Sequence, residues 1–247
     1  SYTVGDGDSQ SLVLTDGTGT LTLKAGQTAT ITGIPVGTAY TVTETSAGDG
    51  FTQTEPENNG SETGTITGTG ETATASFTNH YSVGEVTLNG GDDGTAEALK
   101  VSKTLDGGNW QEGNYSFTFS ITADEENPDQ NAVPKDKTLT INAPAEDNTN
   151  TGAFGKITYT VPGQYKYTIQ ETATSIDGIT VDGAKYVVTV PVTDDGHGNL
   201  TIGDITYTKG GTDYNYEEHG GAMLFTNTYT AESYTLDGST ALKVSKV

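Results

Sequence analysis

Cysteine and arginine are absent from this sequence of 247 residues, and each absence excludes a class of site. Without cysteine there is no disulfide, no thiolate nucleophile and no thiolate-bound metal. All eleven basic residues are lysines, so no guanidinium group can clamp a phosphate or a carboxylate with two hydrogen bonds. An extracellular β-protein without disulfides needs another source of robustness, such as a bound metal or a different covalent link.

Positive charge and apolar residues are also scarce. The sequence has 33 acidic residues and 11 lysines, which gives a formal net charge of −22. This negative charge argues against nucleic acid and anionic membrane surfaces as partners. No apolar run approaches the length of a membrane span. Only 32% of residues are hydrophobic, which nears the composition of disordered chains. Dense alternation of Thr, Val, Ile and Tyr between Gly and Asp clusters nevertheless predicts many short strands and an all-β fold.

A repeated hexapeptide divides the chain. Ala-Leu-Lys-Val-Ser-Lys occurs at 98–103 and again at 241–246, so the chain cuts across a repeat. We predict an all-β unit lacking its first strand, a linker, a complete all-β unit, and a second linker with the first strand of a following unit. Their bounds are 1–82, 83–97, 98–230 and 231–247, and the linker 83–97 is expected to contain one short extended piece. Since neither a signal peptide nor a sorting tail is found, we expect an internal piece of a longer protein.

Alternating segments predict the strands of both units. In the first unit they are 11–14, 19–24, 27–32, 39–44, 64–67 and 72–79. In the second they are 98–104, 116–121, 137–141, 155–160, 164–172, 185–192, 200–207 and 222–229. The polar stretches 123–136 and 145–152 are predicted to be loops.

Three polar residues of the second unit fall on strand faces that are otherwise apolar, since side chains alternate between the two faces of a strand. The three faces are Leu99, Val101 and Lys103; Tyr165, Tyr167, Ile169 and Glu171; and Phe225, Asn227 and Tyr229. A lone ammonium group on a core face is costly. The lysine, the glutamate and the asparagine are therefore the candidate functional residues.

These three residue types support one reaction. Burial disfavours charge, so a buried lysine tends to lose its proton and a buried glutamate tends to gain one. A neutral Lys103 amine is a nucleophile, and a protonated Glu171 can polarise the side-chain carbonyl of Asn227 and shuttle protons as ammonia leaves. The product is a Lys–Asn isopeptide bond. This reaction needs no cofactor, because positioning alone gives effective molarities of about 10⁵–10⁸ M.

The first unit has only part of this set. Tyr40, Val42 and Glu44 share a strand face, and Asn79 lies on another face between Phe77 and Tyr81. The sole lysine, Lys24, comes in mid-segment rather than on an opening strand. Lys246 is the natural candidate for the missing partner. Since the whole second unit separates it from Asn79 in the sequence, we favour donation of 241–247 to another copy, or no bond in this chain.

Three motifs carry a family resemblance. Leu-Lys-Val-Ser-Lys-Thr-Leu-Asp-Gly (99–107), Tyr-Thr-Ile-Gln-Glu-Thr (167–172) and Phe-Thr-Asn-Thr-Tyr (225–229) resemble the streptococcal pilin isopeptide linkage domains of Gram-positive pilins. Residues 1–82, with Tyr-Thr-Val-Thr-Glu-Thr (40–45) and Phe-Thr-Asn-His-Tyr (77–81), look like the B-type repeat of collagen-binding surface proteins.

The resemblance implies two tandem immunoglobulin-like β-sandwich domains in an elongated arrangement, with Lys103, Asn227 and Glu171 in the crosslinking roles. It also implies a stalk or shaft module on the cell wall of a Gram-positive bacterium, with neighbouring domains or subunits of the same pilus as partners. No sortase sorting motif and no polymerising lysine are found. The sequence therefore does not decide whether the module belongs to a shaft subunit or to an adhesin stalk.

Two other functions compete with a structural role. One is an adhesin module that binds a host protein or glycan, for which Trp110 beside Tyr115 is a candidate surface as well as a candidate core anchor. The other is a carbohydrate-active enzyme, which needs a pair of carboxylates in a cleft. No pair stands out among the acidic residues, so we expect self-catalysed bond formation and no enzyme that turns over a substrate.

Metal sites are not expected either. Segments 6–9 (Asp-Gly-Asp-Ser) and 92–94 (Asp-Asp-Gly) invite a calcium interpretation, but the full twelve-position loop with its final glutamate is missing. We predict solvated turns there. His80, His197 and His219 show no ligand spacing and are predicted to lie on the surface.

Overall fold

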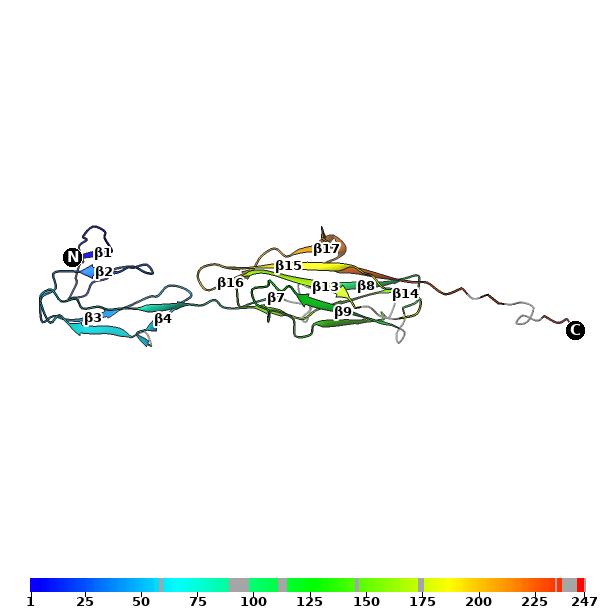
Figure 1. Cartoon of the computed structure of the whole chain (residues 1–247), viewed down its shortest axis with the longest axis horizontal. Helices are drawn as coiled ribbons and strands as arrows, with labels where there is room; N and C mark the ends of the chain where they lie inside the picture. Colours follow the sequence, from blue (N-terminus) through cyan, green and yellow to red (C-terminus); the bar gives the residue numbers. More distant parts are fainter. Residues whose placement is uncertain are drawn as a thin grey trace. The chain divides into compact units, whose positions relative to one another are not determined.

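The computed structural model divides the chain into two compact units, Ser1–Tyr81 and Ser82–Val247 (Figure 1). It describes residues 1–57, 60–88, 98–110, 115–144, 147–172, 176–233, 235–236 and 244–246. Both units are built from β-strands, and the second unit also has one short 3₁₀ turn, η2 (Glu217–His219), among its described residues. Within the described ranges, no helix is long and apolar enough to cross a membrane. The predicted all-β fold is confirmed.

The first unit consists of three antiparallel strand pairs. They are β1 (Tyr2–Val4) with β2 (Ala29–Ile31), β3 (Ala39–Thr43) with β5 (Ser61–Thr65), and β4 (Phe51–Glu55) with β6 (Thr78–Tyr81). The strands predicted at 11–14 and 19–24 are wrong, because these segments pair with no described strand. Three of their apolar residues, Val13, Leu14 and Leu23, are exposed, and Val13 reaches 77%.

The second unit is a sandwich of two sheets, matching the predicted immunoglobulin-like class. The larger sheet has the order β10–β9–β13–β15–β17–β18, and β16 also pairs with β15. These strands are β9 (Ser116–Ala123), β10 (Thr138–Asn142), β13 (Gly163–Glu171), β15 (Lys185–Asp194), β16 (Leu200–Ile202), β17 (Thr206–Lys209) and β18 (Thr212–Asp213). Figure 1 shows β9, β13 and β15 side by side along this unit.

The smaller sheet has the order β11–β8–β19–β14 and contains the two strands that matter most for function. Its strands are β8 (Lys100–Asp106), β11 (Thr149–Ala153), β14 (Ile179–Thr180) and β19 (Met223–Tyr229). The pairing of β8 with β19 is parallel, whereas the other pairings are antiparallel. The first and last long strands of the unit are thus direct neighbours.

One strand forms in a predicted loop, and another forms in the linker where one short extended piece is predicted. Strand β11 occupies part of the predicted loop 145–152, and Asn150 lies opposite Lys103 in its register with β8. Strand β7 (Val86–Leu88) lies in the predicted linker 83–97 and pairs with β12 (Ile157–Tyr159), which buries Leu88. Strand β11 forms because β8 offers unpaired backbone groups, which the local sequence does not reveal. Residues 89–97 lie outside the described ranges.

The core of the second unit lies between its two sheets. Strand β13 alternates buried and partly exposed side chains along its length, as the residue pattern predicts. Trp110 is a core anchor: it packs edge-on against Phe117 and its Nε1 donates to the backbone oxygen of Tyr115. Among the described residues, every buried apolar side chain belongs to the second unit.

Candidate crosslink site

Strands β8 and β19 place Lys103 and Asn227 next to each other. Their parallel register sets Lys103 opposite Phe225 and Asn227 opposite Leu105. Because side chains two residues apart share a face, all four point into the core, and each is at most 1% exposed. The sequence prediction that Lys103 and Asn227 lie on apolar faces is confirmed.

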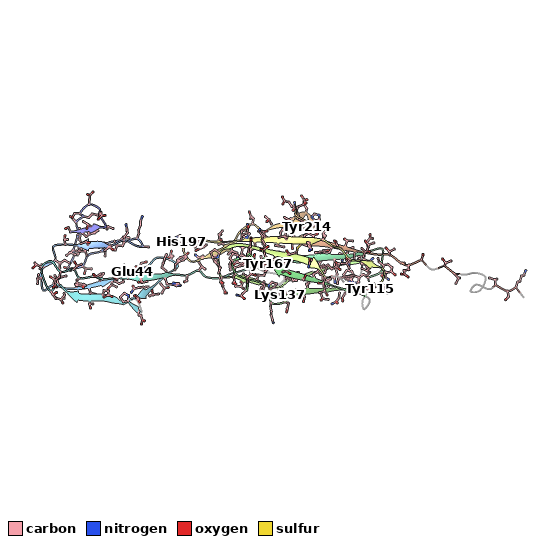
Figure 2. All side chains as sticks on the ribbon, in the orientation of Figure 1. Glu44, Tyr115, Lys137, Tyr167, His197 and Tyr214 are labelled. Atoms are coloured by element: carbon pink, nitrogen blue, oxygen red, sulfur yellow. The ribbon has the colours of Figure 1, made fainter. Side chains whose placement is uncertain are left out.

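Glu171 reaches both side chains from the facing sheet. It is the last residue of β13, and its carboxylate accepts two hydrogen bonds, one at each oxygen. Lys103 Nζ donates to Glu171 Oε2 at 2.8 Å, and Asn227 Nδ2 donates to Glu171 Oε1 at 2.7 Å. A single carboxyl group therefore holds the amine and the amide together. Tyr167, four residues before Glu171 on β13, marks this strand in Figure 2.

Burial shifts both ionisable groups toward their neutral forms. Desolvation lowers the pKa of Lys103 below its ordinary value of 10.5, although the hydrogen bond to Glu171 opposes this shift. Desolvation likewise raises the pKa of Glu171 above 4.5, while its contacts with Lys103 and Asn227 oppose the rise. The ring of Phe117 lies 4.8 Å from Lys103 Nζ and adds to the apolar surroundings. The site thus favours a neutral amine beside a protonated carboxyl group.

Asp182 completes the site and was not among the predicted residues. Its backbone N–H donates to Asn227 Oδ1 at 2.7 Å. Its side chain accepts from the backbone N–H groups of Thr226 at 2.8 Å and of Ala184 at 2.9 Å, which ties the turn after β14 to β19. The sequence gives no signal for this role, because Val-Asp-Gly at 181–183 looks like any other acidic turn of the chain.

The first unit brings Glu44 and Asn79 together without a lysine. Asn79 Nδ2 donates to Glu44 Oε1 at 2.9 Å, and Glu44 is labelled in Figure 2. Glu44 Oε2 is shielded from solvent and has no hydrogen-bond partner. Unlike Asn227, Asn79 is exposed. Lys246 is also exposed, in the described segment 244–246.

The other candidate residues lie at the surface. Asp6, Asp8 and the three histidines are exposed, as predicted for turns and surface positions. His219 stacks on Tyr214 with ring centroids 4.5 Å apart. Within the described ranges, no three His, Asp or Glu side chains cluster in a way that could hold a metal ion. The predicted turn at 92–94 lies outside those ranges.

Comparison with known proteins supports the assignment of the second unit. Residues 99–230 match a family model described as a Spy0128-like isopeptide containing domain. Residues 1–81 match a model described as a domain of unknown function, so the resemblance to a B-type repeat stays a prediction. No curated protein matches the chain.

Solved structures of pilins are also similar to this chain. One is the major pilin from Streptococcus pyogenes, with 25% identity over 53% of this chain and 50% of that one, at a TM-score of 0.42. Another is the major pilin protein T-13 from Streptococcus pyogenes, with 19% identity over 60% of this chain and 54% of that one, at a TM-score of 0.39. The chain spans about half the length of these pilins.

The match to the family model shows the family to which this chain belongs. The matched family is a pilin family of the Gram-positive cell surface and not a family of enzymes. Its model covers 132 of 247 residues (230 − 99 + 1 = 132), which is more than half of the chain. The chain belongs to the family of Spy0128-like isopeptide containing domains, and its second unit is a stalk domain of the Gram-positive pilin type.

Proposed function

We propose that the second unit is a load-bearing module of a pilus stalk, closed by a self-catalysed isopeptide bond between Lys103 and Asn227. One observation carries this proposal: the buried carboxyl group of Glu171 hydrogen-bonds both the amine nucleophile and the amide that it attacks. The bond stabilises the module against force and heat. No substrate is turned over, and no cofactor takes part.

The reaction begins with a proton transfer inside the site. The proton of the Lys103 ammonium passes along its 2.8 Å hydrogen bond to Glu171 Oε2. This step replaces two charges by two neutral groups, which burial favours because a charged group loses its hydration in the core. The neutral amine then has a free electron pair for attack.

Bond formation follows at the amide of Asn227. Lys103 Nζ attacks Cγ, the C=O electron pair moves onto Oδ1, and the backbone N–H of Asp182 stabilises the developing negative charge. The Glu171 carboxyl group then gives its proton to Nδ2 of Asn227. In the same step it takes one proton from Lys103 Nζ, which carries a positive charge after the attack. The Cγ–Nδ2 bond breaks and ammonia leaves, so one N–C bond replaces another and Glu171 is free of any covalent change.

The position of the bond explains its mechanical value. Strands β8 and β19 are parallel neighbours, so tension applied at the ends of the unit shears them past each other. A covalent link between Lys103 and Asn227 carries this load in place of the hydrogen bonds. The 124 residues between the two positions (227 − 103 = 124) are then shielded from extension.

The proposed role also indicates where the module is located and what it contacts. We place the module in a cell-wall-anchored surface structure, with neighbouring subunits of the same pilus at its ends. The adhesin alternative, with a host protein or glycan as ligand, stays a prediction, since no contact among the described residues favours it.

Intact mass of the denatured chain tests the crosslink. We expect a deficit of one ammonia relative to the sequence, and a proteolytic fragment in which Lys103 and Asn227 are joined. The Asn227→Ala chain is expected to show no deficit, since the attacked amide is gone. A mass equal to that of the sequence in the parent chain would refute the proposal.

Single-molecule extension tests the mechanical part. The parent second unit is expected to release no length between residues 103 and 227. The Asn227→Ala unit is expected to lengthen by roughly 400 Å more, because an extended chain spans at most about 3.3–3.6 Å per residue. Equal extension of the two chains would show that no covalent bond bears the load.

A further inference from the structure

Strand β10 forms one edge of the larger sheet, because among the described strands it pairs with β9 alone. The backbone N–H of Ile121 donates to the carbonyl of Lys137 at 3.0 Å, so these two residues are a bonded pair of the ladder. In an antiparallel ladder the bonded positions alternate along each strand. The backbone groups of Thr138 and Thr140 therefore point away from β9, toward the outer edge. Figure 2 labels Lys137, the residue before β10.

The outward backbone groups of β10 have no partner in the protein. Within the described ranges, no main-chain or side-chain hydrogen bond reaches the outward N–H and C=O groups of Thr138 and Thr140. The edge is closed one alternation further along, where Asn150 Nδ2 donates to the carbonyl of Asn142 at 2.9 Å. An edge strand with unpaired backbone groups is a template for another strand.

A pocket of about 320 Å³ lies beside this edge. Strand β10 contributes Thr138, Leu139 and Thr140 to its lining, and the segment between β11 and β12 contributes Phe154. Leu139 is half-buried and Phe154 is buried, so part of the lining is apolar. The pocket thus offers apolar contact next to the unpaired backbone groups.

Two lysines give the pocket a local excess of positive charge. Lys135 and Lys156 line it together with one acidic residue, Asp136, and all three residues are exposed. Among the described residues, none forms an ion pair or a side-chain hydrogen bond with either lysine, although the chain has 33 acidic residues and 11 lysines. Because salt screens charges more than about 8 Å apart, these two ammonium groups dominate the charge that a bound segment meets.

We propose that the outer edge of β10 and this pocket bind an extended acidic segment of a partner protein by strand addition. The backbone of the segment pairs with Thr138 and Thr140, and its carboxylates pair with the two lysines. In this mode of recognition main-chain hydrogen bonds supply affinity, and side-chain contacts supply selectivity. The site is separate from the proposed crosslink, which joins β8 and β19 of the smaller sheet.

The nature of the partner follows from what lines the site. Alternating N–H and C=O groups along β10 match the edge of another strand, which a sugar or a lipid headgroup does not offer. The unpaired ammonium groups of Lys135 and Lys156 select carboxylates, because a basic segment would add like charge beside them. An apolar side chain between the carboxylates would contact Leu139.

Fluorescence polarisation of a labelled peptide tests the site on the full chain. The probe is the capped peptide Glu-Val-Glu-Val-Glu, which alternates acidic and apolar side chains along a strand. We expect saturable binding to the parent chain. Combining Lys135→Glu with Lys156→Glu should weaken it by about tenfold or more, since two attractions become two repulsions. Lys185→Glu is the matched control, because Lys185 is an exposed lysine on β15 inside the larger sheet, and its replacement should leave the affinity unchanged.

Backbone pairing is tested separately from charge. A peptide methylated on every internal backbone nitrogen keeps its charges but cannot donate to the carbonyls of Thr138 and Thr140, so we expect it to lose saturable binding. Thr140→Pro removes an outward N–H, and an edge strand accepts proline at such a position. This variant should bind the unmethylated peptide more weakly, and calorimetry should find its melting temperature close to that of the parent.

Four results overturn the inference. The first is the absence of saturable binding between the acidic peptide and the parent chain. The second is equal binding of Gln-Val-Gln-Val-Gln or of the double lysine variant, which would remove the role of charge. The third is equal binding of the methylated peptide, which would remove strand addition. The fourth is oligomers of the parent chain that Lys135→Glu dissociates, with no binding of the peptide, which would assign this edge to a second copy of the chain.

Discussion

Replacing Glu171 by Gln isolates the role of the carboxyl group. Glutamine has nearly the same volume, but its amide can neither take the proton of Lys103 nor give one to the departing ammonia. It also meets two donors, Lys103 Nζ and Asn227 Nδ2, with a single acceptor oxygen. We therefore expect the E171Q chain to fold and to keep the full mass of its sequence.

The proposed bond carries a stability contribution that follows from loop length. Closing a loop of 124 residues (227 − 103 = 124) lowers the entropy of the unfolded chain by an amount worth about 5 kcal/mol on the scale established for disulfides. For a unit of 166 residues (247 − 82 + 1 = 166), each kcal/mol shifts the melting temperature by about 2–4 °C. The second unit of E171Q is therefore expected to melt about 10–20 °C below that of the parent.

Mass spectrometry of the denatured chain and calorimetry of the folded chain check both expectations. Glu126→Gln is the matched control, because Glu126 is an exposed residue of the same unit and its replacement should change neither mass deficit nor melting temperature. The reasoning is refuted if E171Q still loses one ammonia. It is also refuted if E171Q keeps its full mass and melts with the parent.

Two further predictions concern the surroundings of the site. Asp182→Ala removes the acceptor for the backbone N–H of Thr226 and loosens the N–H that contacts Asn227, so we expect ammonia loss to slow by up to about 100-fold, as followed by mass during refolding. An unchanged rate would mean that this turn does not position the amide. Burial raises the pKa of Tyr186 to about 12, and its hydroxyl donates to the carbonyl of Leu224 at 2.7 Å. Because an unfolded tyrosine ionises near 10.0, this contribution to stability is complete below pH 10 and is lost between pH 10 and about 12. Denaturation of the uncrosslinked Asn227→Ala chain at pH 9 and pH 11.5 should show this fall, and Tyr186→Phe should reduce it by up to about 2–3 kcal/mol. An equal fall in both chains would contradict the assignment.

Residue alternation predicted the strand faces on which the three candidate crosslinking side chains lie. A strand turns successive side chains to opposite faces as a matter of covalent geometry, so Lys103, Glu171 and Asn227 were predicted on apolar faces from their immediate neighbours. Their residue types then indicated the reaction, because an amine, an acid and an amide have few other uses in a core. The predicted domain division at 1–82 followed likewise from a repeat visible in the chain.

Which strands pair, and which distant residues meet, depended on the tertiary structure. The parallel pairing of β8 with β19 joins residues more than a hundred positions apart, and no local pattern encodes such a neighbour. The same holds for β11, which pairs from a segment predicted to be a loop, and for Asp182, whose backbone N–H is aimed at Asn227 by a turn. The shielding of Glu44 Oε2 from solvent is likewise a property of packing, which no local pattern of residues shows. The sequence by itself predicted which side chains form the candidate site, because alternation and residue type are local properties. The tertiary structure decided which of these side chains meet, because strand pairing joins distant segments.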